Sequence, residues 1–191
     1  MSAGNILCEP AAAPRKGFFS FFRDSSFGRL VFLFLIVAGV LFIDQLSKII
    51  VLQRLSSVYS QKVIDGFFSL TLVMNSGVAF GVFSGINCVY KAWVLLAVSG
   101  ITTVAVVIYY FYDQALTLFS RLALAMVVGG ALGNIIDRWR YHKVVDFLDF
   151  YWGDYHFPAF NVADCAISIG VSLLLCEVLL LMWKQNASSF D

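Results

Sequence analysis

The apolar residues of this chain occur in four long runs, separated by shorter and more polar segments. The runs cover residues 30–50, 92–112, 116–136 and 162–183. A helix rises about 1.5 Å per residue, so each run is long enough to cross the roughly 30 Å hydrocarbon layer of a membrane. The pattern predicts a mainly α membrane protein in which four transmembrane helices form one domain, residues 30–184.

The segments outside this domain are short. Residues 1–29 lack the apolar core of a cleavable signal peptide, so we expect the first run to remain as an anchor. The phenylalanines and basic residues of this stretch favour a cytoplasmic or interfacial segment, either a short surface helix or disordered chain. Residues 185–191 are expected to be a cytoplasmic tail.

Basic residues leave the orientation almost balanced, because six lie on the side of the termini and seven on the other side. Four of the six precede the first run, and the first helix often dominates orientation. We therefore expect both termini in the cytoplasm of a cell with a cytoplasmic (inner) membrane.

A period of two replaces the helical pattern in the connection after the first run. Apolar and more polar side chains alternate over residues 68–75, which predicts a half-buried strand. Asp65-Gly66 favours a turn before the strand, and Asn75-Ser76-Gly77 ends it. We expect a small extracytoplasmic β-sheet here, and an aromatic-rich loop over residues 137–161 at the headgroup level.

Composition supports the membrane assignment, since 60% of the residues are apolar and 13% are charged. A net charge of +1 gives no reason to expect a nucleic-acid partner. The four cysteines show no paired spacing, and His142 and His156 lack a zinc-binding pattern. We expect no disulfide framework, no metal and no organic cofactor.

In so apolar a chain, acids beside the hydrocarbon layer are candidates for function. Asp146 follows two valines, and this apolar setting should raise its pKa. Asp164 lies three residues after Asn161, so the two residues are suited either to catalysis or to capping the last helix. Asp149 is expected to be a solvated loop acid, and no role is evident for Glu177.

Other polar residues suggest structural pairs. Asp44 and Lys48 are four residues apart, which suits an ion pair on one helical face. Gly129 and Gly133 allow close helix packing just before a polar group formed by Asn134, Asp137 and Arg138. Arg121, near the start of the third run, is expected to extend its side chain to the membrane surface.

Five motifs, taken together and in order, resemble the bacterial lipoprotein signal peptidases (signal peptidase II), a family of aspartic peptidases. The motifs are Asp44-Gln45-Leu46-Ser47-Lys48, Asn75-Ser76-Gly77-Val78-Ala79-Phe80, Gly130-Ala131-Leu132-Gly133-Asn134-Ile135-Ile136-Asp137-Arg138, Val144-Val145-Asp146-Phe147 and Phe160-Asn161-Val162-Ala163-Asp164. Each string is weak alone, but five in this order on four predicted spans are specific.

The resemblance implies a membrane endopeptidase that removes the signal peptide from diacylglyceryl-modified prolipoproteins, cutting before the lipidated cysteine near the outer face. Asp146 and Asp164 would be catalytic. The residues implied to support them are Asn134, Asp137, Arg138 and Asn161, and those implied to shape the substrate site are Asp44, Lys48, Asn75 and Gly77. The expected partners are these prolipoproteins and membrane lipids, and we expect a monomer.

Two neighbouring carboxyl groups do not both ionise readily, so one retains a proton while the other acts as a base. The sequence does not say which of Asp146 and Asp164 is the base. Two alternatives stay open, an ion-coupled transporter and a non-enzymatic membrane assembly factor. A transporter should place its acids near the middle of the membrane, where this chain has only Glu177.

Overall fold

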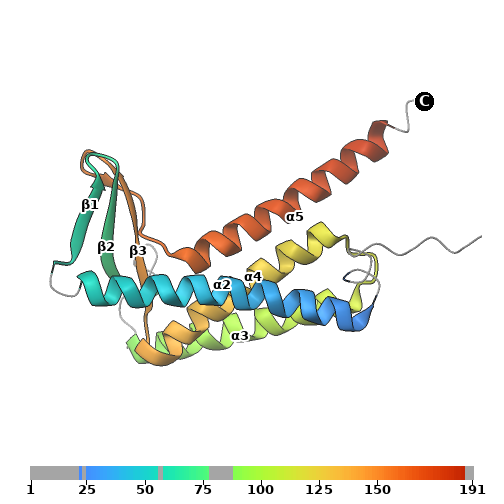
Figure 1. Ribbon diagram of the computed structural model, residues 1–191, viewed down its shortest axis with the longest axis horizontal. Coiled ribbons are helices and arrows are strands. Elements are labelled where there is room, and N and C mark those ends of the chain that lie inside the picture. Colours follow the sequence, from blue (N-terminus) through green and yellow to red (C-terminus); the bar gives the residue numbers. More distant parts are fainter. Residues whose placement is uncertain (1–21, 23–24, 56–57, 78–87, 188–191) are drawn as a thin grey trace, which may run out of the picture.

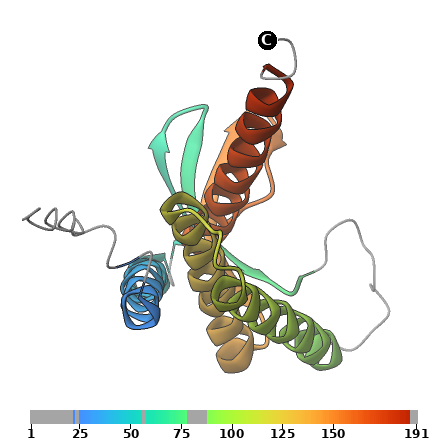
Figure 2. The same cartoon turned by 90° about the vertical axis from the view of Figure 1, so that its right-hand side faces the viewer.

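The computed structural model describes residues 22, 25–55, 58–77 and 88–187, which form four long helices and a small sheet (Figures 1 and 2). The helices are α2 (Ser26–Leu55), α3 (Cys88–Tyr112), α4 (Leu118–Tyr141) and α5 (Val162–Ala187). The strands are β1 (Ser60–Ile64), β2 (Phe68–Asn75), β3 (Val144–Trp152) and β4 (Tyr155–His156).

All four helices are long and apolar enough to cross a membrane, in agreement with the four predicted spans. The third helix begins at Leu118, two residues later than expected, and continues to Tyr141. Most of the N-terminal segment expected over residues 1–29 lies outside the described residues.

Helix α4 is the centre of the bundle and contacts each of the other three helices. In the most apolar 18-residue stretch of α4, 56% of the residues are buried, whereas in the corresponding stretches of the other helices 11–17% are buried. Glycines permit this close packing: a Cβ atom at Gly129 would lie 2.8 Å from Val40 of α2, and one at Gly130 would collide with the carbonyl oxygen of Ala163 in α5. The predicted role of Gly129 in helix packing is therefore confirmed.

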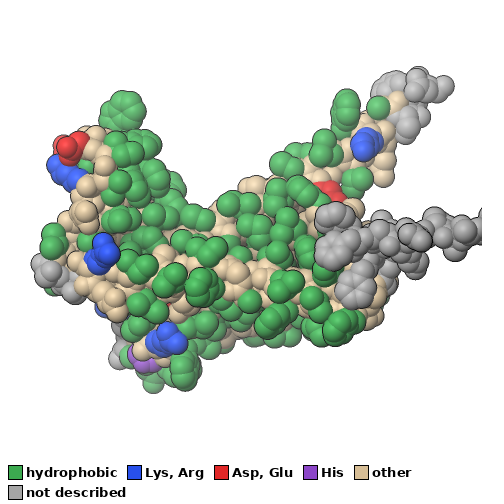
Figure 3. All heavy atoms as spheres, in the orientation of Figure 1, with side chains coloured by type: hydrophobic (Ala, Val, Ile, Leu, Met, Phe, Trp, Pro, Cys, Tyr) green, Lys and Arg blue, Asp and Glu red, His purple; other side chains and the backbone are tan. Residues whose placement is uncertain are grey.

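The outer surfaces of the helices are apolar. Figure 3 shows hydrophobic side chains along the visible sides of the bundle, with the charged side chains gathered near its two ends. Leu179, Leu181 and Trp183 on α5 are each more than half exposed, as are Ile101 and Ile108 on α3. Side chains of this kind are stable at such exposure when lipid, not water, surrounds them.

The sheet lies at the end of the bundle where α2 and α4 end and α5 begins (Figure 1). Its strands are antiparallel and follow the order β1-β2-β3-β4. The alternation over residues 68–75 correctly predicted β2. Strand β3 was not predicted, because Asp146 and Asp149 are three residues apart and interrupt the two-residue period.

Two predictions about single residues are wrong. Arg121 is fully buried and does not extend to a surface, since its guanidinium donates to the carbonyl oxygens of Tyr110 and Asp113 at the end of α3. A cation at this position stabilises the negative end of the helix dipole.

Asp149 is not a solvated acid, because only 7% of its surface is exposed. Its carboxylate accepts hydrogen bonds from Ser69 and Thr71 of β2 and contacts Nδ1 of His156 of β4 at 2.8 Å. Burial acts to raise its pKa, but the bonds from His156, Thr71 and Ser69 outweigh burial and lower it. The residue therefore joins three strands.

Glu177, which had no assigned role, links two helices. Its carboxylate accepts hydrogen bonds from the hydroxyl groups of Thr117 at 2.6 Å and Ser120 at 2.5 Å. Thr117 is the N-cap of α4, so these bonds hold α5 to the first turn of α4.

Candidate active site

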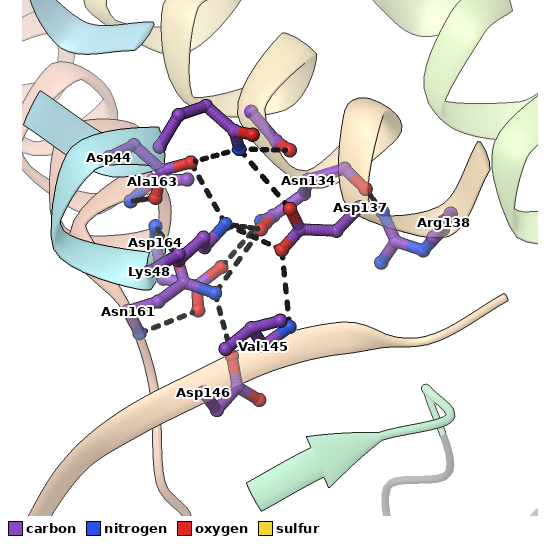
Figure 4. Close-up of polar contacts among 12 residues, drawn as sticks. Asp44, Lys48, Asn134, Asp137, Arg138, Val145, Asp146, Asn161, Ala163 and Asp164 are labelled. Atoms are coloured by element: carbon purple, nitrogen blue, oxygen red, sulfur yellow. Dashed lines mark hydrogen bonds and ion pairs between the residues drawn. The ribbon is translucent and has the colours of Figure 1, made fainter. Parts of the chain in front are cut away.

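The polar side chains singled out by the motifs meet beside the sheet, at the junction of α2, α4, β3 and α5 (Figure 4). They come from segments far apart in the sequence, and the bond from the Ala163 N–H to Asp44, for example, joins residues separated by 119 positions. The two candidate catalytic acids, Asp146 and Asp164, belong to this group.

Asp146 lies on β3 and is 2% exposed. Its Oδ1 accepts a hydrogen bond from Nδ2 of Asn161 at 2.6 Å, and its Oδ2 accepts one from Nδ2 of Asn75 at 2.8 Å. Burial is the main reason that the pKa of Asp146 rises from 3.8 to about 6. The charge of Asp164 adds to this rise, while the two amide hydrogen bonds and the charge of Lys48 oppose it.

Asp164 lies in the first turn of α5 and forms a capping box with Asn161. The Asp164 N–H donates to Oδ1 of Asn161 at 3.1 Å, and the Asn161 N–H donates to Oδ2 of Asp164 at 3.2 Å. The remaining oxygen, Oδ1, accepts a hydrogen bond from Nδ2 of Asn134 at 2.8 Å. Asn161 and Asp164 therefore cap the helix, one of the two roles that the sequence left open.

Asn161 is the residue that brings the two acids together. Its side-chain amide binds Asp146, while its main-chain N–H binds Asp164. It is fully buried, and its Nδ2 also donates to Oδ1 of Asn134. The two carboxyl groups are thus held by one buried residue and act on each other electrostatically.

Asn75 combines a turn with a contact to the site. Its Oδ1 accepts a hydrogen bond from the N–H of Gly77 at 2.8 Å, and Gly77 has a φ of +77° that favours glycine. This turn directs Nδ2 of Asn75 toward Asp146. Gly77 takes part through its backbone N–H, and this turn places it next to the candidate site.

Asp44, Lys48 and Asp137 form a buried ionic cluster behind the two acids. The Lys48 ammonium lies 2.9 Å from Asp44 and 2.8 Å from Asp137, so the predicted Asp44–Lys48 pair is present. All three residues are at most 2% exposed, and in this structure they contact protein groups instead of an open surface. Their implied part in the substrate site stays a prediction.

Arg138 lies at the edge of the site and is partly exposed. Its Nη1 donates to the carbonyl oxygen of Asn134 at 3.4 Å. Its charge interacts with those of Asp137, Asp146 and Asp164. The guanidinium therefore offsets part of the negative charge that gathers here.

Gln45 is a site residue to which the sequence assigned no role. Its Nε2 donates to Asp44, to Asp137 and to the carbonyl oxygen of Gly133. Its only signal in the sequence is its place beside Asp44 in the first motif. Gly133 permits this arrangement, since a Cβ atom there would lie 2.5 Å from Oδ2 of Asp44.

A cavity of about 420 Å³ opens beside Asp164. Its walls are largely apolar and are formed by Phe157, Phe160, Asp164, Cys165, Ser168 and Ile169. Asp164 is partly exposed, whereas Asp146 does not line the cavity. A ligand in this space would thus approach Asp164 first. Over the described ranges, no three His, Cys, Asp or Glu side chains are grouped in a way that suits a metal ion.

Comparison with known proteins gives consistent results. A model of the family described as Signal peptidase (SPase) II matches residues 18–180. The lipoprotein signal peptidase of Syntrophus aciditrophicus is 42% identical over 148 residues, which are 77% of this chain and 92% of that protein. The lipoprotein signal peptidase of Desulforapulum autotrophicum is 43% identical over 152 residues, 78% of this chain and 93% of that protein.

Solved structures agree with these relatives. A bacterial membrane enzyme determined by the in meso method at 1.9 Å resolution has a TM-score of 0.67 and 34% identity, covering 77% of this chain and 92% of that one. Another, at 2.3 Å resolution, has a TM-score of 0.65 and 33% identity, covering 77% and 87%.

Proposed function

The chain belongs to the signal peptidase II family of aspartic peptidases, and on this premise we propose that it cuts diacylglyceryl-modified prolipoproteins before the lipidated cysteine. It is a multi-pass membrane peptidase. The observation that carries the proposal is the double contact of Asn161, which binds both Asp146 and Asp164.

We place the chemistry on these two carboxyl groups. The raised pKa of Asp146 supports a pair that holds one proton at or below about pH 6. The ionised member takes a proton from water as the water attacks the scissile carbonyl, and the protonated member donates a hydrogen bond to the carbonyl oxygen. Collapse of the tetrahedral intermediate breaks the C–N bond, and a proton passes to the leaving amine.

The cavity beside Asp164 suits a substrate that carries acyl chains. Phe157, Phe160 and Ile169 give it apolar walls, and its position on α5 places it next to the helix surface that faces lipid. In our proposal the peptide reaches Asp164 at this cavity while the acyl chains remain among the membrane lipids. The sheet and the site then lie at the outer face of the cytoplasmic membrane, with the termini in the cytoplasm.

The proposal is tested with the purified full chain and a synthetic lipidated precursor peptide. We expect Asp146→Asn and Asp164→Asn each to reduce the rate of cleavage at least about a thousandfold, because each removes one member of the pair. Asp65→Asn is the matched control, since the Asp65 side chain is 86% exposed on the β1–β2 turn.

Folding of each variant is checked by thermal unfolding and the cleavage position by mass spectrometry. Full cleavage by both folded variants would exclude the aspartyl mechanism. Cleavage of a precursor that lacks the lipid at an unchanged rate would exclude the proposed substrate class. Cation flux into vesicles containing the protein, without peptide cleavage, would instead support the transporter.

A further inference from the structure

Two buried carboxylates hold the residues that directly precede the two candidate catalytic acids. Oδ1 of Asp44 accepts a hydrogen bond from the N–H of Ala163 at 2.9 Å, and Ala163 is followed by Asp164. Oδ2 of Asp137 accepts a hydrogen bond from the N–H of Val145 at 3.1 Å, and Val145 is followed by Asp146. The first turn of α5 and the start of β3 are thus anchored in the same way.

Lys48 joins these two anchors. Its Nζ lies 2.9 Å from Oδ2 of Asp44 and 2.8 Å from Oδ2 of Asp137, and it donates to Oδ1 of Asn134 at 3.3 Å. An ammonium group has three N–H donors, so these three acceptors use all of them. The side chain is 3% exposed. A substrate would find no free N–H on Lys48 in this structure.

The bond to Asn134 extends the arrangement to the acids themselves. Oδ1 of Asn134 accepts from Lys48 and from Asn161, which leaves its Nδ2 to donate to Asp164. The ammonium therefore also fixes which way the Asn134 amide points, because Oδ1 must face the two donors.

The charge of Lys48 is needed for these contacts to persist. Two carboxylates that are at most 1% exposed and bind one ammonium would repel each other if that ammonium were removed. At least one of Asp44 and Asp137 would then move away from the other, and its hydrogen bond from Ala163 or Val145 would weaken.

From these contacts we infer that Lys48 is a positioning residue of the peptidase, one that couples α5 and β3 so that Asp164 and Asp146 keep their mutual geometry. The inference rests on the proposed function. It assigns Lys48 to the alignment of the acid pair and not to substrate binding, the role that the family resemblance implied.

The charge of Lys48 also reaches the pair. The charged side chains that act on Asp146 come from three helices and are Lys48, Arg138 and Asp164. The positive charge of Lys48 lowers the pKa of Asp146, so its removal raises that pKa. Asp146 would then keep the shared proton to higher pH, and the basic limb of the profile of kcat/KM against pH would move upward.

The experiment compares Lys48→Met with the wild-type full chain in the precursor cleavage assay. Methionine keeps the length and apolar stem of lysine but removes the charge and the donors. The matched control is Lys62→Met on β1, because the Lys62 side chain is 72% exposed. Within the described residues its side chain forms only a 3.4 Å ion pair with Asp65.

For Lys48→Met we expect kcat to fall at least about tenfold, KM to stay within about threefold, and the basic limb to move up by roughly half a pH unit or more. Lys62→Met should match the wild type in all three. Asp137→Asn, which removes a negative charge beside Lys48, should move the basic limb the other way.

A rise in KM at unchanged kcat would overturn the inference in favour of substrate binding. If the pH profile of Lys48→Met is unchanged and its activity falls only in proportion to the unfolded fraction, Lys48 has a structural role alone. If Lys48→Met does not fold, the pH profile of Asp137→Asn decides the question. A basic limb that moves to higher pH, or that does not move, overturns the inference. Failure of the wild type to cleave the precursor would refute the proposed function itself.

Discussion

Asn161 performs two tasks that substitutions can separate. Its Oδ1 caps α5 and its Nδ2 binds Asp146. Serine also caps helices but has no amide donor, whereas alanine can do neither. We predict that Asn161→Ser and Asn161→Ala both lower kcat about a hundredfold or more, since each loses the donor to the acid pair.

Thermal unfolding and cleavage rates of the two variants make the comparison. Asn161→Ala should unfold with a free energy about 1 kcal/mol lower than that of Asn161→Ser, because only serine retains the cap. Normal cleavage by folded Asn161→Ser would show that the Asn161–Asp146 contact is dispensable.

The pKa of Asp146 has a consequence for stability. In the folded protein it is raised from 3.8 to about 6, so the folded state binds the proton more tightly than the unfolded state does. Stability contributed by Asp146 is therefore present below the unfolded pKa and is lost as the pH rises to about 6.

Asp146→Asn removes this titration. Relative to the wild type, its free energy of unfolding should increase by about 2 kcal/mol between pH 4 and pH 7, since a shift of one pKa unit corresponds to about 1.4 kcal/mol and pH 4 already lies just above the unfolded pKa. Unfolding in detergent over this range measures the difference, with Asp65→Asn as a control for an exposed acid. A difference that is independent of pH would contradict the raised pKa.

Among the helices, the contact of α4 with α5 controls the site most directly. A Cβ atom at Gly130 would collide with the carbonyl oxygen of Ala163, one residue before Asp164. We predict that Gly130→Ala pushes the first turn of α5 away from α4, lowers the free energy of unfolding by about 1–3 kcal/mol and reduces cleavage at least about tenfold.

Gly100→Ala is the matched control, because a Cβ atom at Gly100 in α3 has open space around it. It should leave cleavage unchanged and leave stability unchanged or slightly higher, since alanine favours a helix by up to about 1 kcal/mol over glycine. Equal effects of the two substitutions on cleavage would show that the α4–α5 contact does not position Asp164.

The protein as a whole has the small sheet at one end and a short connection between α3 and α4 at the other (Figure 1). Our proposed orientation places the sheet outside the cell membrane. A cysteine introduced at Asp65 in a chain without its native cysteines should therefore react in intact cells with a maleimide that cannot cross the membrane.

A cysteine at Ala115, in the connection between α3 and α4, should react only after the cells are opened. Labelling is read by the mass shift of the purified protein. The reverse pattern would show that the termini are outside the cytoplasm and would invert the proposed orientation.

Much of this architecture followed from local patterns. A run of apolar residues long enough to span a membrane must form a helix there, because a helix satisfies its own backbone hydrogen bonds in lipid. Alternation correctly predicted β2, and the three-residue separation of Asn161 and Asp164 matched a capping box. These features depend on neighbouring residues and are therefore visible in the order of side chains.

The sequence alone determined the four membrane spans, the strand over residues 68–75 and, through five ordered motifs, the family and its candidate acids. Only the tertiary structure decided which polar groups meet. Lys48 between Asp44 and Asp137, the exposure of Asp164 to the cavity and the burial of Arg121 all depend on contacts between distant segments. Local propensity carries no information about such contacts. The two partners lie on different helices or strands, and they meet only when those elements pack together.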